Sequence, residues 1–162
     1  MTFAAVKPTG TKAEIYRELV QQAEGLLAGE RDAIANAANL ASLIWHALPD
    51  LNWSGFYFMR GGELVLGPFQ GKPACVRIAV GKGVCGTAVA RDQSIVVADV
   101  DAFPGHIPCD SASRSELVVP LRQNGKVVGV LDLDSPNLDR FDDEDRAGLE
   151  ELAALWSAAS SL

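Results

Sequence analysis

The chain has 162 residues, the usual size of one domain, and we expect a single domain over residues 1–162. Hydrophobic residues make up 48% and charged residues 22%, so the chain can build a core and carries too little charge for a disordered protein. Acidic residues outnumber basic ones by 21 to 14, and the net charge of -7 excludes a nucleic-acid-binding protein and a protein that docks on anionic membranes.

Two helices are expected first. Residues 11–28 and residues 32–48 both carry apolar side chains at helical spacing. Gly29 is a typical stop for the first helix, Asp32 is a typical N-cap for the second, and Pro49 ends it. The sequence therefore predicts a pair of N-terminal helices.

Short strands follow, and the period of the apolar residues changes from helical to alternating. We expect strands at Trp53–Met59, Glu63–Gly67, Cys75–Val80 and Ile95–Ala98, with one or two helical turns at Cys85–Ala90 before the last of these. Gly61-Gly62 is a typical hairpin turn between the first two strands.

The segment Asp99–Ser115 is expected to be a long irregular loop, and loops of this length are usually functional or disordered. Two further strands, Glu116–Leu121 and Val127–Asp134, flank the hairpin signal Asn124-Gly125. The acids 142–145 open a last helix that ends near Trp156. This order of elements predicts an α+β fold with a largely antiparallel sheet packed by helices.

Carboxylates gather at the end of the last predicted strand. Alternation places Val128, Val130, Asp132 and Asp134 on one face of it, and Glu116 at the start of the neighbouring strand is expected to lie near them. Buried carboxylates need partners. They either cap loop amides at the sheet edge or form a negative cluster for a cation, an ammonium group or a shared proton.

Three cysteines are too few for a secreted disulfide framework, and no apolar run approaches the roughly 18 residues that cross a bilayer. The short apolar stretch before Lys7 is no signal peptide. We therefore expect a cytoplasmic protein with no membrane partner and with reduced thiols, and cysteines that matter in that compartment are catalytic or metal-binding.

The three cysteines lie in different settings. Cys75 opens a predicted strand, Cys85 lies at a helix N-terminus, which lowers the pKa of a thiol, and Cys109 lies in an accessible loop. Each could instead be a small buried apolar residue. Together with His106 they could form a zinc set, which the absence of a C-x-x-C pair weakens.

Other signals have simpler explanations. The G-x-G-x-x-G pattern at residues 81–86 is typical of dinucleotide binding only within a βαβ unit, so here we interpret it as a turn. His46 is expected to be part of the second helix, and His106 to be a hydrogen-bonding loop residue rather than a base. Trp53 and Tyr57 share one face of a strand and either line a pocket or pack within the sheet.

Five segments carry a resemblance to a known family. They are 52–57 (NWSGFY), 66–78 (LGPFQGK and ACVRI), 81–88 (GKGVCGTA), 105–116 (GHIPCD leading to Ser115-Glu116) and 129–135 (GVLDLDS). Together they resemble the free methionine-(R)-sulfoxide reductases, GAF-domain enzymes, over roughly residues 15–155. Residues 1–10 lie outside the resemblance and are expected to form a flexible extension.

The resemblance implies an enzyme that reduces free L-methionine (R)-sulfoxide, is recycled by thioredoxin, and uses no metal or organic cofactor. It assigns Cys109 as the nucleophile and Cys75 as the resolving cysteine, and it leaves Cys85 as a pocket residue, an alternative resolving cysteine or a rival nucleophile. A GAF domain with this fold could alternatively be a non-catalytic module that senses a small ligand. The family likeness also implies a homodimer that pairs through its N-terminal helices.

The resemblance also implies roles for the substrate-binding residues. Glu116, Asp132 and Asp134 would bind the ammonium group of a free amino acid, hydrogen-bond the substrate or hold a proton for the sulfoxide oxygen. Trp53 and Tyr57 would contact the methyl and thioether end, because contact between sulfur and an aromatic ring is favourable.

Overall fold

The computed structural model describes residues 3–162 and contains one six-stranded sheet with the strand order β3-β2-β1-β6-β5-β4. Every neighbouring pair of strands is antiparallel. The strands are β1 (Trp53–Arg60), β2 (Glu63–Gly71), β3 (Arg77–Ala79), β4 (Ile95–Val97), β5 (Ser115–Gln123) and β6 (Lys126–Ser135). The helices are α1 (Lys12–Leu27), α2 (Ala33–Ala47), α3 (Gly83–Arg91), the 3-10 turn η1 (Val100–Ala102) and α4 (Asp143–Ala159).

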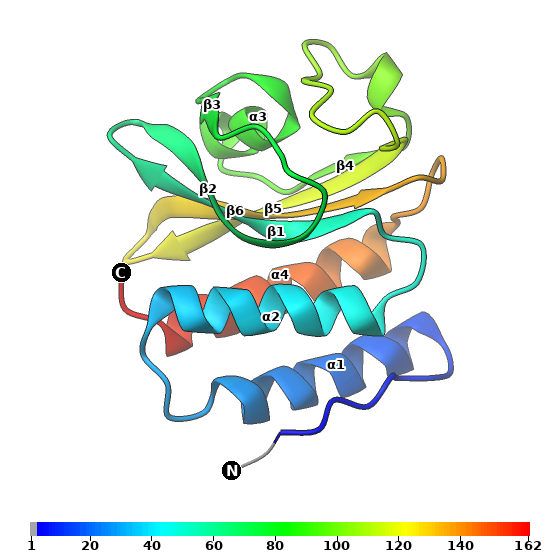
Figure 1. Cartoon of the computed structure of the whole chain (residues 1–162), viewed down its shortest axis with the longest axis vertical. Helices are drawn as coiled ribbons and strands as arrows, with labels where there is room; N and C mark the ends of the chain where they lie inside the picture. The colour runs from blue at the N-terminus through cyan, green and yellow to red at the C-terminus, as the bar shows by residue number, and fades with distance from the viewer. Residues whose placement is uncertain (1–2) are drawn as a thin grey trace.

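The helices are divided unequally between the two sides of the sheet (Figure 1). α2 and α4 cover one side, and α1 packs on them from outside. α3 and the connection that contains η1 lie on the other side, where α3 packs across β5 and β6. The predicted α+β architecture with an antiparallel sheet is confirmed.

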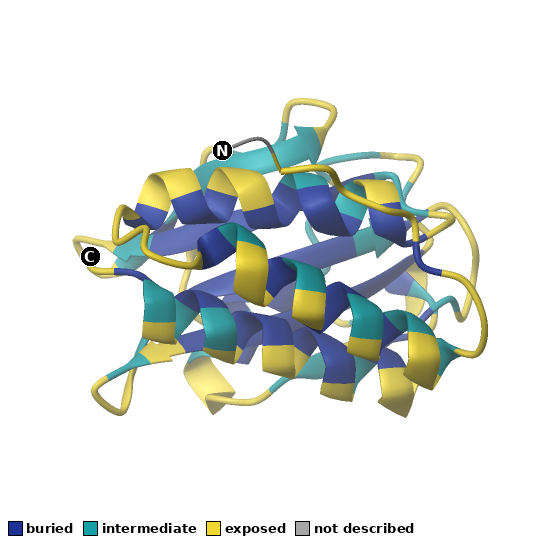
Figure 2. Cartoon of the chain, turned by 90° about the horizontal axis from the view of Figure 1, so that it is seen from below, coloured by how far each residue is buried: buried dark blue, intermediate teal, exposed yellow. Residues whose placement is uncertain are grey.

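The helix boundaries follow from capping residues. Thr11 caps α1 in a capping box with Glu14, Asp32 accepts a hydrogen bond from the Ala35 N–H at the start of α2, and Asp142 forms a capping box with Asp145 at α4. The residues on the inward side of each of these helices are buried, and those on the outward side are exposed (Figure 2). The two N-terminal helices and the last helix are where the sequence predicts them.

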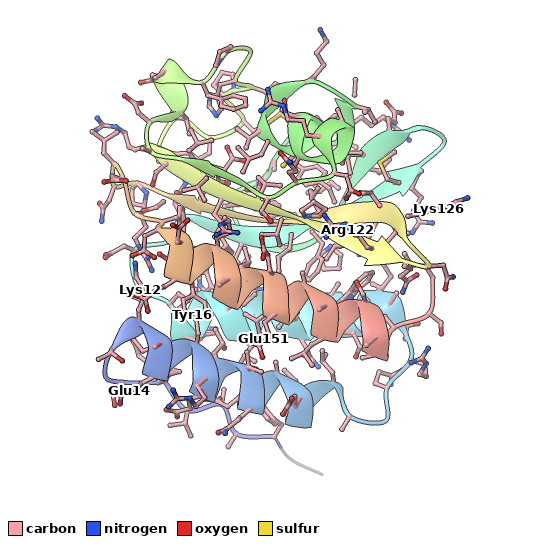
Figure 3. All side chains as sticks on the ribbon, turned by 180° about the vertical axis from the view of Figure 1, so that it is seen from behind. Lys12, Glu14, Tyr16, Arg122, Lys126 and Glu151 are labelled. Atoms are coloured by element: carbon pink, nitrogen blue, oxygen red, sulfur yellow. A yellow bond between two sulfur atoms is a disulfide. The ribbon has the colours of Figure 1, made fainter. Side chains whose placement is uncertain are left out.

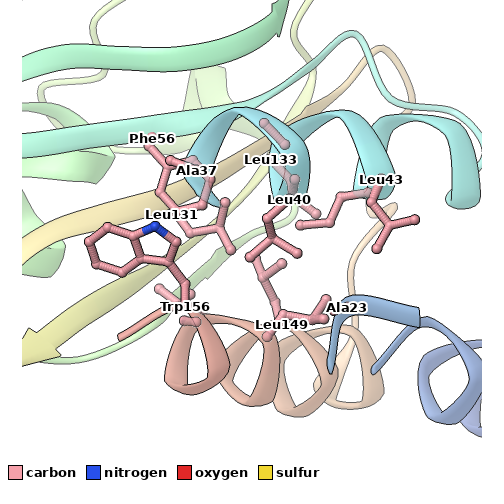
Figure 4. Close-up of a cluster of buried hydrophobic side chains, with 14 of the residues drawn as sticks. Ala23, Ala37, Leu40, Leu43, Phe56, Leu131, Leu133, Leu149 and Trp156 are labelled. Atoms are coloured by element: carbon pink, nitrogen blue, oxygen red, sulfur yellow. The ribbon is translucent and has the colours of Figure 1, made fainter. Parts of the chain in front are cut away.

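The larger core lies between the sheet and the helices (Figure 4). Phe56 and Phe58 from β1 and Leu131 and Leu133 from β6 point to this side and are buried. The Trp156 ring lies 5.4 Å from the Phe58 ring and 5.7 Å from the Phe56 ring, and its N–H donates to the Ala33 carbonyl. Burial of these large apolar side chains provides most of the driving force for the helix-on-sheet packing.

A second buried feature of the helical side is the carboxylate of Asp145, which has no exposed surface. It accepts hydrogen bonds from Lys12 at 2.7 Å, Tyr16 at 2.7 Å, Arg140 at 3.3 Å and the Asp142 N–H at 3.0 Å. Lys12 and Tyr16 project from α1 toward α4 in Figure 3. The pairing joins the start of α4 to α1.

Two predicted strand details are wrong. The strand expected at Cys75–Val80 is only β3, because β2 continues to Gly71, paired with Trp53, and the chain then needs a connection that contains Cys75. The alternation expected to place Val128 beside Val130 is interrupted. Leu121 pairs with Gly129 while its neighbour Arg122 pairs with residue 127, so Val128 is an extra residue that packs on the helical side.

The N-terminal extension is described only from residue 3, so residues 1 and 2 of the predicted flexible segment lie outside the described residues. Val6 exchanges two hydrogen bonds with the Gln22 side chain of α1. Among residues 3–162, no helix has both the length and the apolar character that crossing a membrane would require.

Candidate active site

The three central strands bring the predicted polar residues to one end of the sheet, on the side away from α1, α2 and α4. Trp53 of β1 pairs with Asp134 of β6, which pairs with Glu116 of β5, so these three form one row across the sheet. Asp132 lies two residues further along the same face, opposite Gly55 and Val118. The prediction that Glu116 lies near the two aspartates is confirmed.

Gly55 leaves space on this face of the sheet for the side chains of Trp53 and Phe69. A Cβ atom at this position would overlap the Phe69 side chain and the indole ring of Trp53. Only glycine therefore allows Trp53 to lie flat beside Phe69, with ring centroids 5.2 Å apart.

A small cavity lies on this side of the sheet, beneath the N-terminal end of α3 and two loops. The first loop follows β2 and contains Cys75, and the second follows η1 and contains Cys109. The lining side chains are Trp53, Tyr57, Pro73, Ala74, Ile78, Gly83, Val84, Cys85, His106, Ile107, Cys109, Asp110, Ser113, Glu116, Asp132 and Asp134. Seven of the eight predicted site residues line the cavity, and the eighth, Cys75, is bonded to the lining residue Cys109.

The aromatic wall of the cavity is held by two hydrogen bonds. The Trp53 N–H donates to the Lys72 carbonyl at 3.1 Å, and the Tyr57 hydroxyl donates to the Cys75 carbonyl at 2.8 Å. The two rings are stacked with centroids 5.8 Å apart. Of the two interpretations of this pair, the pocket-lining one is confirmed, and the rings also tie the Cys75 loop to the sheet.

Cys75 and Cys109 form a disulfide that joins the two loops over the cavity, with their Cα atoms 5.6 Å apart. Cys85 remains a free thiol. The zinc set of three cysteines and His106 is not brought together, because two of its sulfur atoms are bonded to each other.

Cys85 is the third residue of α3 and points down onto the carboxylates. Its Sγ lies 3.5 Å from Asp132 Oδ2 and 4.0 Å from Glu116 Oε1. Burial, followed by the charges of Asp132, Glu116 and Asp134, raises the pKa of this thiol well above its usual value. The expectation that the helix N-terminus lowers the pKa of Cys85 is therefore wrong, because desolvation and negative neighbours outweigh the helix field.

The three carboxyl groups also hold their protons more strongly than usual. Burial raises the pKa values of Glu116 and Asp134 well above their usual range, and the neighbouring charge of Asp132 adds to both shifts. Burial raises the pKa of Asp132 to about 6, and the neighbouring Glu116 carboxyl group and Cys85 thiol oppose part of that shift. The three interacting acids therefore retain protons to higher pH than separate carboxyl groups would.

The capping interpretation of these acids does not describe their contacts. Within residues 3–162 no backbone N–H donates to the side chains of Glu116, Asp132 or Asp134, and Asp132 Oδ1 is buried without a hydrogen-bond partner. A buried carboxylate oxygen with no donor is costly unless a ligand satisfies it. The cluster is thus arranged to receive a polar group from the cavity.

Comparison with known proteins agrees with this arrangement. A GAF domain model matches residues 13–159. The free methionine-R-sulfoxide reductase of Escherichia coli (strain K12) is 52% identical over 143 residues, which cover 88% of this chain and 87% of the relative.

Two solved structures are also close. The free methionine-R-sulfoxide reductase of Neisseria meningitidis in complex with its substrate is 46% identical, with a TM-score of 0.94 over 98% of this chain and 95% of that one. A structure titled a putative GAF sensor protein from Burkholderia vietnamiensis is 58% identical, with a TM-score of 0.90 over 93% and 96% of the two chains. The chain belongs to the free methionine-R-sulfoxide reductase family of GAF-domain proteins.

In this family member, three site residues were not predicted from the sequence. The Asn52 amide donates to Asp110 Oδ2 at 3.1 Å and to Ser113 Oγ at 2.9 Å, and so anchors the Cys109 loop to the start of β1. Asp110 also accepts from the Ala112 N–H, which lowers the pKa of its carboxyl group. The sequence offers one indication of these residues: Asn52 directly precedes Trp53 and Asp110 directly follows Cys109 within the family motifs.

His106 is a fourth residue whose position the sequence did not specify. It was expected to be a hydrogen-bonding loop residue, and it lines the cavity with its Nε2 3.9 Å from Glu116 Oε2. Its side chain is 15% exposed, and burial lowers the pKa of the imidazole. It is the only histidine, lysine or arginine among the lining residues.

Proposed function

We propose that this protein reduces free methionine (R)-sulfoxide to methionine and uses its own cysteines as the reductant. The observation that carries the proposal is that Cys109, bridged to Cys75, opens onto the same cavity as the buried acids Glu116 and Asp132 and the partly buried Asp134. The relatives named as reductases of this substrate support it.

In the first step the Cys109 thiolate attacks the sulfur of the sulfoxide. The sulfur–oxygen bond of the substrate breaks, the oxygen is transferred to Cys109 as a sulfenic acid, and methionine leaves as the thioether. The substrate sulfur gains two electrons and Cys109 loses two. A proton delivered to the sulfoxide oxygen makes the oxygen easier to transfer.

In the second step the Cys75 thiol attacks the sulfenic sulfur of Cys109. The new sulfur–sulfur bond displaces hydroxide, which leaves as water after it takes up the Cys75 proton. The sum is two thiols and one sulfoxide converted to one disulfide, one thioether and one water. The Cys75–Cys109 bridge in the structure corresponds to the end of this step.

The carboxyl cluster divides into two roles in this proposal. Asp132, with a pKa of about 6, is mainly ionised at neutral pH and pairs with the substrate ammonium group. Glu116 or Asp134, whose pKa values burial raises well above their usual range, supplies the proton for the sulfoxide oxygen. A peptide-bound methionine sulfoxide lacks the ammonium group, so the cluster favours the free amino acid.

The aromatic wall binds the other end of the substrate. Trp53 and Tyr57 are placed to contact the methyl group and the thioether sulfur, because sulfur packs favourably against aromatic rings. Cys85 is a pocket residue in this scheme, since a buried thiol with a raised pKa is a poor nucleophile.

The oxidised protein needs an external dithiol for the next turnover. We propose thioredoxin for this exchange, a cytoplasmic location where such a reductant is available, and a homodimer that pairs through the N-terminal helices. Light scattering of the purified protein tests the dimer, and replacement of thioredoxin by another dithiol protein tests the reductant.

The decisive experiment is stereospecific turnover. The purified protein receives thioredoxin, thioredoxin reductase and NADPH with either the R or the S epimer of free methionine sulfoxide. We expect NADPH oxidation with the R epimer alone, and a loss on the order of 10⁴-fold or more in the Cys109→Ser variant. N-Acetylmethionine sulfoxide is the matched substrate control, and we expect it to react far more slowly because it has no ammonium group.

Two results would contradict the proposal. Absence of turnover with both epimers, also with dithiothreitol as reductant, would leave a ligand-sensing GAF module as the function. Equal turnover of the N-acetylated substrate would contradict the role given to the carboxyl cluster.

A further inference from the structure

One thiol sulfur and two carboxylate oxygens, all of them atoms that can bind a metal ion, lie close together in the cavity. Cys85 Sγ and one oxygen each of Glu116 and Asp132 all lie within 4.8 Å of one another, and all three residues are buried. Cys85 keeps its free thiol in the form of the protein in which Cys75 and Cys109 are bridged.

The spacing fits a tetrahedral ion. Zinc–sulfur and zinc–oxygen bonds of about 2.3 and 2.0 Å at a tetrahedral angle put the two ligand atoms about 3.5 Å apart. Cys85 Sγ lies 3.5 Å from Asp132 Oδ2 and 4.0 Å from Glu116 Oε1. One of these separations matches the expected spacing and the other is within about half an ångström of it, so only a small shift of the Glu116 side chain is required.

A second observation points to a ligand at this place. Asp132 is 5% exposed, lines the cavity, and has one carboxylate oxygen with no hydrogen-bond partner. His106 lies next to this cluster, with its Nε2 3.9 Å from the second oxygen of Glu116, but it is not one of the three grouped ligands. The remaining coordination position faces the cavity, which can hold water.

We propose that Cys85, Glu116 and Asp132 bind a thiophilic divalent cation, with Zn²⁺ as the type, and that the bound ion excludes the substrate. A thiolate ligand selects Zn²⁺ over Mg²⁺ and Ca²⁺, which take oxygen ligands. Binding releases the Cys85 proton to solvent, together with any proton held by Glu116 or Asp132, and changes no oxidation state. The exclusion rests on the proposed function, because the ion occupies the carboxylates that the substrate ammonium group would use.

The test is calorimetric titration of ZnCl₂ into the protein in its disulfide form, which removes Cys75 and Cys109 as competing ligands. We expect one ion per chain. Cys85→Ser and Asp132→Asn each weaken binding by at least about tenfold, since even outer-shell partners of a metal contribute 10- to 100-fold. Asp110→Asn removes a carboxylate of the same cavity outside the cluster, and its affinity stays within about threefold of wild type.

Cadmium provides a spectroscopic readout of the same site. Cd²⁺ bound to the disulfide form gives sulfur-to-metal charge-transfer absorbance, which Cys85→Ser abolishes. Circular dichroism checks that each variant is folded, and Asp132→Asn keeps the test intact if the serine variant is not.

Competition separates this inference from the proposed function. Saturating L-methionine is expected to lower the apparent affinity for Zn²⁺ by about tenfold or more. Zinc affinity unchanged in both variants would overturn the site. Zinc bound through Cys85 and Asp132 without competition by methionine would overturn the exclusion, whereas the epimer assay decides the reductase function independently.

Discussion

Asp145 and Asp132 are both buried, on opposite sides of the sheet, and their surroundings differ completely. Asp145, on the helical side, accepts hydrogen bonds from Lys12, Tyr16, Arg140 and a backbone N–H. Asp132, on the cavity side, contacts a thiol and keeps one oxygen unpartnered. The protein itself supplies the hydrogen-bond donors for the Asp145 carboxylate, whereas the Asp132 carboxylate has an oxygen free to bind a ligand.

The same strands build both sides because successive residues alternate between them. Leu131 and Leu133 of β6 join the core beneath the helices, and Asp132 and Asp134 face the cavity. The helical side contains the larger apolar core, whereas the cavity side combines a smaller core with acids whose burial reduces stability. Substitution of the buried aspartate on each side should consequently change the free energy of unfolding in opposite directions.

The largest effect on stability is expected at Asp145. Asp145→Asn removes the charge that Lys12 and Arg140 share and should lower the free energy of unfolding by about 3–5 kcal/mol. The control is Asp142→Asn, whose more exposed carboxylate also pairs with Lys12, with a cost below about 1 kcal/mol. Urea denaturation measures both, and equal losses would contradict the distinction between the two aspartates.

The opposite sign is expected at Asp132. Its pKa is raised from 3.8 to about 6 in the folded protein, so the unfolded chain releases the proton first as pH rises. The associated stability is complete below pH 4 and is lost by about pH 6, a difference on the order of 3 kcal/mol. Asp132→Asn cannot ionise and should be more stable than wild type above pH 6 by a similar amount.

The check on Asp132 is a series of urea denaturation curves from pH 4 to pH 7 for both proteins. The difference in unfolding free energy should grow in favour of the variant across this range. Parallel pH profiles would show that the burial of Asp132 costs the fold nothing.

A smaller contrast is expected between two buried tyrosine hydroxyls. Tyr16 donates to the Asp145 carboxylate and Tyr57 donates to the Cys75 carbonyl, both at hydrogen-bond distance. Tyr16→Phe should cost about 1.5–3 kcal/mol because its acceptor is charged, and Tyr57→Phe about 0.5–1.5 kcal/mol. A larger loss in Tyr57→Phe, measured by the same denaturation, would reverse the ranking of the two sides.

Local chemistry explains which parts of the fold were predictable. Asp32 and the acids that begin α4 cap their helices through contacts within a few residues, and Asn124-Gly125 adopts the positive φ angles of a tight hairpin. The position of Glu116 beside the aspartates follows from alternation once the two strands pair. In each of these cases, the residues that determine the structure lie within one or two neighbouring elements of the chain, so the sequence alone is sufficient for the prediction.

The predictions are wrong or incomplete where contacts between segments far apart in the sequence determine the structure. Val128 does not lie on its expected face, because the pairing of β6 with β5 contains a bulge there. The sequence of β6 alone does not indicate this bulge. The pKa of Cys85 depends on carboxylates 31 and 47 residues away in sequence, whereas the helix N-terminus is local and visible. The anchoring of the Cys109 loop by Asn52 spans 58 residues and was equally hidden.

The bridge between Cys75 and Cys109 closes a loop of 34 residues around α3 and β4. By chain entropy, a closed loop of this length destabilises the unfolded chain by about 4 kcal/mol. In the proposed cycle the protein therefore alternates between a cross-linked and an open chain with each substrate consumed. When the external dithiol reductant is depleted, the protein accumulates in the disulfide form. The condition that stops turnover therefore also stabilises the inactive molecules against unfolding and proteolysis.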